Sequence, residues 1–491
     1  MGSRGNRAFV RVETAYFGRM SLPILTPAQM RQWEEATWAS GQTEAEVIRR
    51  VGEAVAARAL TLTKPGDSLL LLAGKGHNGD DVRATRAHLA ERQVELIEVS
   101  DPQTARPALE RALASWPALV LDGLFGTGLD RPLDDAWLGL IVRLNSANCR
   151  VLSVDLPSGL HGETGEPQPE AVRAELTLTV GAPKSGLLLP PAWPYTGRVE
   201  VLGGVGLTAE PPRGGDVQWT QREDFVGLPP RREASGHKGT YGHLAILAGS
   251  QGFAGAAVLA ARGALRARPG LVTIFTTQEA YYAIASQCQA VMVKPWSADL
   301  KLPGDFTAVL AGPGLSGLGV PAEMAPFVRR AWRDAKLPMV VDATGLDWLV
   351  RDPVPWNTIR VVTPHPGEAG RMIKNTTEQI QSRRLHSLRE VSRCHGNCLV
   401  ALKGHQTLVG RNEGDVFVNS SGGPHLAQGG SGDLLAGYVA GLLAQPAWQE
   451  DALRTLRWAV WQHGAAADAL EARQPNWTVE DLERDLGRIL P

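Results

Sequence analysis

A glycine-rich stretch near the C-terminus carries the residues that most directly suggest chemistry. It reads LAQGGSGDLLAG over residues 426–437, with Gly429, Gly430 and Gly432 ahead of Asp433. Glycines that open an apolar helix leave backbone N–H groups free, and these groups bind an anion such as phosphate. A carboxylate fits beside a phosphate if it takes a proton from a hydroxyl that meets the phosphate. The stretch therefore predicts phosphoryl transfer with Asp433 as base. The structural alternative is a glycine-rich turn that Asp433 caps.

Other chemistry-bearing residues of the C-terminal half follow apolar runs. Asp342, His365 and Lys403 each stand at or just after the end of such a run. Each has a structural alternative: Asp342 as a turn cap, His365 as part of a rigid turn between two prolines, and Lys403 as a side chain that reaches out to solvent. Together they predict a nucleotide and a second ligand in one crevice.

The elements that position these residues are predicted to be strands of parallel sheets. Apolar runs alternate with helix-like segments along the chain, and most runs end in Gly, Asp, Pro or His. This βαβ pattern is typical of α/β folds, whose ligands bind outside the carboxyl ends of the strands. The predicted strands lie in residues 68–74, 118–125, 150–157, 243–249, 307–314, 338–345, 360–368 and 398–404.

The chain is long enough, at 491 residues, for more than one domain. The series of strands breaks once, between about residues 203 and 236, in a stretch rich in Pro, Gly and Arg. We predict two α/β domains with a boundary near residue 215. The expected organisation is an N-terminal arm over 1–22, a first domain over 23–215, a linker over 216–235 and a second domain over 236–491.

Composition restricts the classes of partner. The formal net charge is −1, so no overall field favours nucleic acid or an anionic membrane. No apolar run reaches the length of a membrane span, and the N-terminus lacks the apolar core of a signal peptide. Four cysteines are too few for a disulfide scaffold, and we expect a reducing cytoplasm. Cys394, His395 and Cys398 suggest a metal, but no second ligand cluster is near, which favours structural cysteines.

Seven blocks of the C-terminal half, over about residues 225–490, occur in the order of a known family. The half resembles the nicotinamide-nucleotide hydrate dehydratases, which have the ribokinase-like αβα fold. The resemblance implies removal of water from NADHX and NADPHX, the hydrated forms of NADH and NADPH. The hydrate hydroxyl would be phosphorylated by ADP in bacteria or ATP in eukaryotes, and phosphate would then be eliminated. The blocks are HKGTYGHLAILAGS, GAAVLAARGALRARPGLVTI, AGPGLS, VVDATGL, VVTPHPGEAGRM, LKGHQT and LAQGGSGDLLAG.

The same resemblance implies roles for individual residues. Asp433 would deprotonate and touch the hydrate. Mg2+ is expected with ADP or ATP, although no residue identifies its ligands. The family's second Asp in its DADAL block is replaced by Thr344, and His425 lies where the family has Gly in Asn-Pro-Gly-Met. The implied hydrate-pocket residues are Ala256, Gly314 and His365, and the implied nucleotide-binding residues are Lys403, Gly404, Thr407, Gly429, Gly430 and Gly432.

Three strand ends of the N-terminal half also carry polar residues. Asn78, Asp122 and Ser158 offer hard oxygen ligands, which suit a group-one or group-two cation rather than zinc. The loop from Gly126 to Gly128 can lie against a pyrophosphate, with Arg131 near it. The alternative is three ordinary polar turns between strands and helices.

These blocks, over about residues 23–205, resemble the nicotinamide-nucleotide hydrate epimerases, a Rossmann-like αβα family often fused to the dehydratase. They include LTPAQMRQWEEATWASG, LDGLFGTGLDRPL and VDLPSGLHGETG. The resemblance implies interconversion of the R and S hydrates. It implies K+ at Asn78, Asp122 and Ser158, and a hydrate-binding, proton-handling role for Asp155. The implied hydrate-binding residues are His77, Asn78, Gly79, Asp80, Asp81, Gly126, Thr127, Gly128, Leu129, Arg131 and Asp155.

The leading hypothesis is thus a bifunctional hydrate-repair enzyme, which resembles families that form homo-oligomers. Two alternatives remain open at this stage. Asp80 and Val82 replace glycines of the epimerase family, so the first domain could be a non-catalytic nucleotide-binding module beside an active dehydratase. The second domain could instead be a ribokinase-like kinase of a small alcohol.

Overall fold

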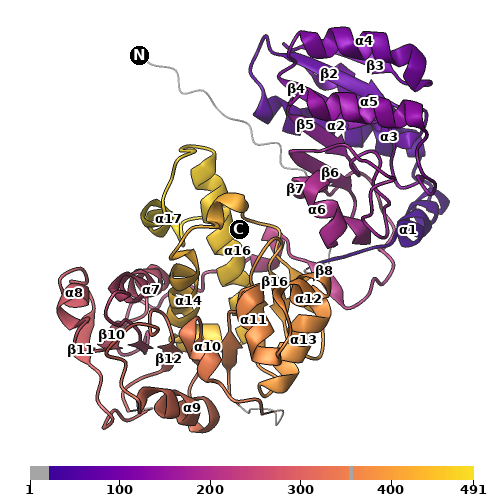
Figure 1. Ribbon diagram of the computed structural model, residues 1–491. Helices are drawn as coiled ribbons and strands as arrows, with labels where there is room; N and C mark the ends of the chain where they lie inside the picture. Colours follow the sequence, from indigo (N-terminus) through magenta and orange to yellow (C-terminus); the bar gives the residue numbers. More distant parts are fainter. Residues whose placement is uncertain (1–20, 303, 353–357) are drawn as a thin grey trace. The chain divides into compact units, whose positions relative to one another are not determined.

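The computed structural model describes residues 21–302, 304–352 and 358–491. The chain divides into two compact units, one ending at Gly215 and the other beginning at Asp216, and each contains a largely parallel sheet with helices (Figure 1). The predicted arm, residues 1–22, lies outside the described residues except for Ser21 and Leu22. Within the described ranges, every helix is too short or too polar to cross a membrane.

The sheet of the first unit is parallel throughout, with the order β3-β2-β4-β5-β6-β7. Its strands are β2 (Ser68–Ala73), β3 (Gln93–Glu98), β4 (Leu119–Gly123), β5 (Val151–Val154), β6 (Leu176–Val180) and β7 (Arg198–Leu202), and the two-residue β1 (Leu22–Pro23) precedes them. Its helices are α1 (Pro27–Ala39), α2 (Glu44–Leu62), α3 (His77–Thr85), α4 (Pro102–Ala114), α5 (Asp135–Ser146) and α6 (Trp193–Thr196).

Alternating side chains of β2 bury the two faces of this sheet. Leu69 and Leu71 pack with the apolar residues of α1 and α2, whereas Leu70 and Leu72 pack with those of α4 and α5. The chain passes from β2 to β3 on one side and to β4 on the other. A reversal of this kind leaves a crevice at the carboxyl ends of β2 and β4, where α/β proteins bind their ligands.

The sheet of the second unit has the order β8-β17-β16-β15-β14-β13-β12-β9-β10-β11. It is parallel from β11 to β15, and β16 is antiparallel to both of its neighbours. Its strands are β8 (Val217–Trp219), β9 (His243–Leu247), β10 (Leu271–Thr276), β11 (Met292–Pro295), β12 (Ala308–Ala311), β13 (Met339–Val341), β14 (Arg360–Val362), β15 (Leu399–Leu402), β16 (Leu408–Gly410) and β17 (Val416–Val418).

The helices of the second unit include a long apolar pair, α7 and α14, at the centre of its core. The chain reverses direction in the sheet between β9 and β12, which creates a second crevice at their carboxyl ends. The helices are α7 (Ala254–Ala267), α8 (Tyr281–Ala285), α9 (Met324–Asp334), α10 (Thr344–Trp348), α11 (Pro366–Ile373), α12 (Thr377–Ser382), α13 (Arg384–Cys394), α14 (Ser431–Leu443), α15 (Pro446–Gln449), α16 (Ala452–Glu471) and α17 (Val479–Asp485).

Each of the eight predicted runs contains a strand, and the α/β class is confirmed for both units. The stretch 216–235, which we expected to be a linker, is instead part of the second unit. Its β8 pairs with β17, and Phe225 is fully buried, with its ring 5.4 Å from that of Trp458. A three-residue strand that pairs with β17 and one buried aromatic ring thus attach this stretch to the second unit. Such a short signal is hidden among Pro, Gly and Arg.

The close packing of α7 against α14 depends on small residues. A Cβ placed on Gly437 of α14 would lie 1.9 Å from the carbonyl oxygen of Ala260. A Cβ placed on Gly263 of α7 would lie 2.1 Å from that of Leu434. The backbones of the two helices are therefore in contact, and this contact fixes the position of the N-terminus of α14.

We expect Gly437→Ala to destabilise the second unit. Alanine ordinarily stabilises a helix interior by about 1 kcal/mol relative to glycine. Here the added methyl group must push α7 and α14 apart, and overpacking of this kind costs about 1–3 kcal/mol. Gly255→Ala is the matched control, because Gly255 lies in α7 with open space where its Cβ would be. Urea unfolding should show a lower stability for the first variant only; equal behaviour of both variants would contradict the packing argument.

Candidate active sites

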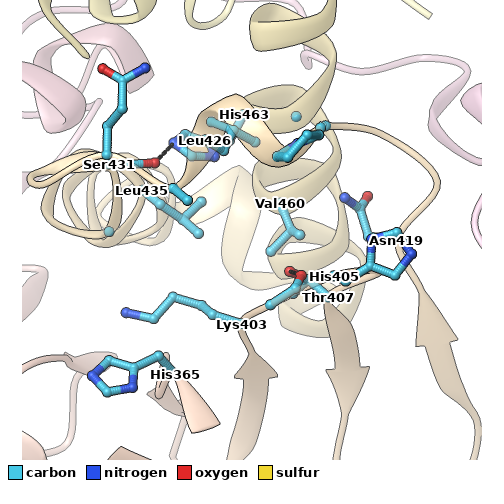
Figure 2. A pocket seen from close by; sticks show the side chains of 18 of the residues that line it. His365, Lys403, His405, Thr407, Asn419, Leu426, Ser431, Leu435, Val460 and His463 are labelled. Atoms are coloured by element: carbon cyan, nitrogen blue, oxygen red, sulfur yellow. Dashed lines mark hydrogen bonds between the residues drawn. The ribbon is translucent and has the colours of Figure 1, made fainter. Parts of the chain in front are cut away.

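The second unit contains a cavity of ≈ 650 Å³ between the ends of β13, β14 and β15 and the start of α14. In Figure 2, Lys403 and Thr407 lie on one side of this cavity and Ser431 lies on the other. The residues that line it are Asp342, Ala343, His365, Glu368, Lys403, Gly404, His405, Gln406, Thr407, Asn419, Ser421, Gly422, Gly423, Pro424, Leu426, Ala427, Gln428, Gly430, Ser431, Gly432, Asp433, Leu435, Val460, His463 and Gly464.

The glycine-rich stretch opens a helix, as the sequence predicts. α14 begins at Ser431, and Gly430 precedes it with φ +91°, a left-handed conformation that favours glycine. No side chain caps this helix start, so the structure does not show Asp433 as an N-cap. The first N–H groups of α14 have no partners within the helix, and its dipole favours negative charge there. The geometry fits an anion site with Asp433 in the first helical turn.

One ammonium group lies among the carboxyl groups of this cavity. Lys403 Nζ is 2.9 Å from Asp342 Oδ1 and 3.8 Å from Glu368 Oε2. Thr363 donates a hydrogen bond to the same Asp342 oxygen at 2.8 Å. Burial alone would lower the pKa of Lys403, but Asp342, Glu368 and Asp433 outweigh burial and raise it. Lys403 is therefore a fixed positive charge, and a Cβ on Gly432 would lie 3.2 Å from its nitrogen.

Asp433 has a carboxyl group that is ready to exchange a proton near neutral pH. Burial raises its pKa to about 7, Asp342 and Glu368 act in the same direction, and Lys403 opposes them. A group whose pKa matches the working pH is suited to general-base catalysis. The predicted role of Asp433 as a base has this electrostatic support.

His365 has two distinct ring nitrogens in this structure. It is the N-cap of α11, where Nδ1 accepts from the N–H groups of Gly367 and Glu368. The Glu368 side chain accepts from the His365 N–H at 2.8 Å, which completes a capping box. Nδ1 thus acts as an acceptor, whereas Nε2 lies 3.5 Å from Glu368 Oε1.

The structure brings most of the predicted dehydratase residues together. His365, Lys403, Gly404, Thr407, Gly430, Gly432 and Asp433 all line the cavity. Ala256 and Gly314 are not among the lining residues. They meet at the crevice between β9 and β12, where a Cβ on Gly314 would lie 3.0 Å from that of Ala256. Gly429 precedes the helix start and does not line the cavity.

Sequence reasoning gave no role to Glu368 or His463. Glu368 stands three residues after His365, and this spacing is the capping-box signal that could have revealed it. His463 comes from α16, and its Nε2 lies 3.4 Å from the Ser431 hydroxyl (dashed in Figure 2). Burial lowers its pKa to about 4, so it is neutral. No sequence pattern connects residues so far apart in the chain.

The alternative metal site at Cys394, His395 and Cys398 has no support in the structure. All three residues are buried, and His395 Nδ1 lies 2.8 Å from the carbonyl oxygen of Val391. Burial raises the pKa of the Cys398 thiol. No group of three or more His, Cys, Asp or Glu residues suited to a metal occurs in the described part of the chain.

In the first unit, Asp122 forms the centre of a buried polar cluster at the β2–β4 crevice. It accepts from the Ser153 hydroxyl at 2.8 Å and from the Ser158 hydroxyl and N–H at 2.6 and 2.9 Å. Asn78 donates to the carbonyl oxygen of Phe125 at 2.7 Å. The Asn78 Oδ1 is buried without a hydrogen-bond partner. An unpaired buried oxygen is costly, and a cation beside these oxygens would satisfy it.

Asp155 lies at the end of β5 with φ +64°, a strained conformation for a residue with a side chain. It forms an ion pair with Lys184, and it accepts from the Val180 N–H at 3.0 Å. The side chain of Lys184 is only 1% exposed. Sequence reasoning did not single out Lys184. The sequence feature that could have indicated Lys184 is its position shortly after the apolar strand β6.

Two further acids lie near this ion pair. Burial raises the pKa of Asp81 well above its usual range, Asp155, Asp80 and Glu34 reinforce the effect, and Lys184 opposes it. Burial also raises the pKa of Glu34 on α1, with Lys184 opposing and Asp155 reinforcing the change. The site thus combines an ion-paired carboxyl group with two acids whose pKa values are raised by burial.

The remaining predicted epimerase residues fall into two groups. Gly126 lies against Asn78, since a Cβ on Gly126 would be 3.2 Å from the Asn78 Cβ, and Thr127, Gly128, Leu129 and Arg131 continue from it along the same loop. The side chains of His77 and Asp80 instead have partners outside the cluster. His77 pairs with Glu44 at 2.8 Å, and Asp80 pairs with Arg83 at 2.7 Å.

The expected glycine loop is already helical from His77, because α3 begins there. Gly79 lies so close to β2 that a Cβ would be 2.1 Å from the carbonyl oxygen of Gly74. Val82 lies within α3 and packs against Gly123, and its backbone does not adopt a positive φ. Asp80 has Arg83 as its counter-charge. The two substitutions that suggested a non-catalytic module are therefore accommodated by the local structure.

Both units are α/β folds with charged residues at strand ends, where proteins of this class bind nucleotides and other small phosphorylated ligands. A family model described as NAD(P)H-hydrate dehydratase matches residues 244–491. A model described as YjeF-related protein N-terminus matches residues 99–186. Because relatives with 33–34% identity to this chain span both units, the chain belongs to the family of bifunctional NAD(P)H-hydrate repair enzymes.

Relatives from distant bacteria span both units. The chain is 34% identical over 515 residues to the bifunctional NAD(P)H-hydrate repair enzyme Nnr of Gloeobacter violaceus, covering 96% of this chain and 98% of the relative. It is 33% identical over 464 residues to the enzyme of the same name from Escherichia coli, covering 89% and 88%. A solved ADP/ATP-dependent NAD(P)H-hydrate dehydratase from Bacillus subtilis is 30% identical, with a TM-score of 0.48, covering 55% of this chain and 96% of that one.

We expect Asp433→Asn to stabilise the second unit above neutral pH. A carboxyl whose pKa is raised on folding is easier to ionise in the unfolded chain, so wild-type stability falls as pH rises from about 4 to about 7. Asparagine removes this penalty. Calorimetry should show equal melting temperatures for the variant and wild type near pH 4. At pH 8, the melting temperature of the variant should be higher by a few degrees. A difference that does not change with pH would contradict the assignment.

Proposed function

We propose that this chain repairs hydrated NADH and NADPH. Its second unit removes water from S-NADHX and S-NADPHX with ADP or ATP as phosphoryl donor, and its first unit interconverts the R and S hydrates. The observation that carries the proposal is the cavity in which Asp433, in the first turn of α14, faces Lys403 and has a pKa of about 7. Membership in the repair-enzyme family, with both units matched, supports both activities.

In the dehydratase, the Asp433 carboxylate takes the proton of the hydrate hydroxyl as its oxygen attacks the terminal phosphorus. The free N–H groups of the glycine-rich turn stabilise the charge on the transferred phosphoryl group. Lys403 adds a positive charge, fixed by Asp342 and Glu368. The phosphorylated hydroxyl then leaves as phosphate, and loss of a ring proton restores the dihydronicotinamide.

The remaining cavity residues bind the two ligands. Gly404, Thr407, Gly429, Gly430 and Gly432 hold the nucleotide, whereas Ala256, Gly314 and His365 contact the hydrate. Mg2+ is usually held by one or two carboxylates together with phosphate oxygens. Asp342 and Glu368 are carboxylates of the cavity that suit it. When bound with the nucleotide, Mg2+ neutralises phosphate charge.

In the epimerase, Asp155 binds the hydrate and handles its proton, and residues 77–81 and 126–131 contact the rest of the ligand. Asn78, Asp122 and Ser158 are the residues that would hold K+. The unpaired Oδ1 of Asn78, the carbonyl oxygen of Phe125 and the buried Asp122 carboxylate fit a large monovalent cation. When bound, K+ supplies positive charge at the carboxyl end of the sheet.

For the protein as a whole, we propose NADHX, NADPHX and ADP or ATP as its ligands. We also propose that the chain acts in the cytoplasm as a homo-oligomer, without nucleic acid or membrane partners. The net charge of −1 gives no basis for attraction to either polyanion.

Two substitutions should separate the two activities. Asp433→Asn removes the hydroxyl base, and we expect dehydration of pure S-NADHX to slow by about 10²–10⁴-fold. Asp155→Asn should leave that reaction intact and abolish R-to-S conversion. Chiral chromatography of the hydrates, with absorbance at the NADH band, measures both reactions. Loss of both activities in either single variant would contradict the assignment of one reaction to each unit.

Exchanging K+ for a large organic cation should slow epimerisation and leave dehydration of S-NADHX unchanged. The same exchange should lower the melting temperature of the first unit, because K+ stabilises only the folded site. Asn78→Leu, which removes the unpaired oxygen, should make that melting temperature independent of K+. Equal K+ dependence in wild type and Asn78→Leu would place the cation elsewhere.

A further inference from the structure

Four charged side chains of the first unit gather at the carboxyl edge of its sheet, and four different elements supply them. They are Glu34 from α1, Asp81 from α3, Asp155 from the end of β5 and Lys184 from the loop after β6. Asp155 and Lys184 form an ion pair, and both influence the electrostatics of Asp81 and of Glu34. Asp81 and Lys184 are both buried. One cation thus faces three carboxyl groups.

Lys184 is held in place by more than its ion pair. Its ammonium also donates to the carbonyl oxygen of Val180 at 2.8 Å and to the Thr179 hydroxyl at 3.3 Å. The backbone on both sides of Lys184 hydrogen-bonds to Leu25, just before α1. The ammonium therefore has a fixed position, and it is directed at a single oxygen of Asp155.

Asp155 and Asp81 have opposite surroundings. One oxygen of Asp155 accepts from the Lys184 ammonium, the Val180 N–H and the Thr179 hydroxyl. Asp155 is thus the carboxyl group that pairs with the ammonium. Asp81 is buried and faces the negative groups Asp155, Asp80 and Glu34, with Lys184 as the positive group, and its protonated form is favoured. Glu34 additionally faces His77 and Arg31. Two carboxyl groups in such different surroundings are suited to paired acid and base catalysis.

The substrate chemistry requires such a pair. Hydration of the enamine bond in a dihydronicotinamide places the hydroxyl on the carbon next to the ring nitrogen. The ring nitrogen can push its lone pair toward that carbon and expel the hydroxyl, if an acid protonates the leaving oxygen. A second water must then reach the other face of the resulting planar carbon and lose a proton to a base.

We propose that Asp81 and Asp155 form the acid–base pair of the epimerase, with Lys184 as the residue that positions Asp155. The inference rests on the proposed epimerase function. Asp81 gives its proton to the hydroxyl, the C–O bond breaks, and water leaves with the bonding electron pair. The nitrogen lone pair forms the C=N bond of an iminium ion. A water adds to the opposite face, its proton goes to Asp155, and the C=N electrons return to nitrogen. Transfer of the proton from Asp155 to Asp81 through water resets the site.

The first test measures the fate of the hydroxyl oxygen. Wild-type protein with K+ converts R-NADHX to S-NADHX in H2¹⁸O without nucleotide, and mass spectrometry follows the label. The proposal expects about one solvent oxygen for each inversion, after subtraction of the reaction without enzyme. Inversion without label would overturn it, because the hydroxyl would not have left. Absence of any inversion would instead overturn the proposed epimerase function itself.

The second test assigns the residues. Asp81→Asn should slow inversion by about 10²–10⁴-fold, and Asp81→Glu, which retains a carboxylic acid, should recover part of the rate. Asp135→Asn, at an exposed carboxylate in the first turn of α5, is the matched control and should be unchanged. An Asp81→Asn variant that melts like wild type and inverts at the Asp135→Asn rate would overturn the role of Asp81. Faster inversion in Asp81→Glu than in Asp81→Asn would support it.

A pH profile tests the positioning role of Lys184. Removal of an adjacent cation makes a carboxylate bind its proton more readily. In Lys184→Met, the acidic limb of kcat/KM should therefore move up by about 1–3 pH units. Lys184→Arg retains the cation, and its limb should stay near that of wild type. An unshifted limb in Lys184→Met would overturn the positioning role, since a structural defect would lower the rate at every pH.

Discussion

Each unit places one lysine ammonium among more carboxyl groups than it can neutralise. Lys403 faces Asp342, Glu368 and Asp433, and Lys184 faces Asp155, with Asp81 and Glu34 nearby. Burial disfavours the charged form of a carboxyl group and neighbouring like charges reinforce this, so carboxyl groups in each set hold their protons more tightly than in water. Burial is the largest cause and the neighbouring carboxyl groups reinforce it, so the pKa of Asp433 rises to about 7 and the pKa of Asp81 rises well above its usual range. The chemistry of these two carboxyl groups thus depends on their burial beside other carboxyl groups.

The sheets bring these charges together, since parallel strands present their carboxyl ends along one edge. In the second unit, Asp342 follows β13 and Lys403 follows β15, while Asp433 arrives on α14. Close contact between α14 and α7 through glycine places that helix start over the strand ends. A change in packing far from the cavity would therefore move Asp433 relative to Lys403, so stability and chemistry depend on the same contacts.

The sequence predicted the strands and many of the polar residues because both signals are local. Apolar runs that end in Gly, Asp or His identify strands, and glycines before a helix identify an anion site. Lys184 and His463 escaped notice because their importance comes from partners distant in the chain, Asp155 and Ser431. The short strand β8 was likewise invisible, because its stability comes from pairing with β17 rather than from its own three residues.

The most direct test of the account is absorbance recovery at the NADH band from a mixture of R- and S-NADHX. The wild-type chain would be supplied with K+, Mg2+ and ADP, and the assay would be repeated with ATP. We expect complete recovery with at least one nucleotide, because the epimerase converts the R form into the substrate of the dehydratase. Recovery that stops when the S form is consumed would contradict an active epimerase. No recovery with either nucleotide would contradict the central claim that this chain repairs hydrated nicotinamide nucleotides.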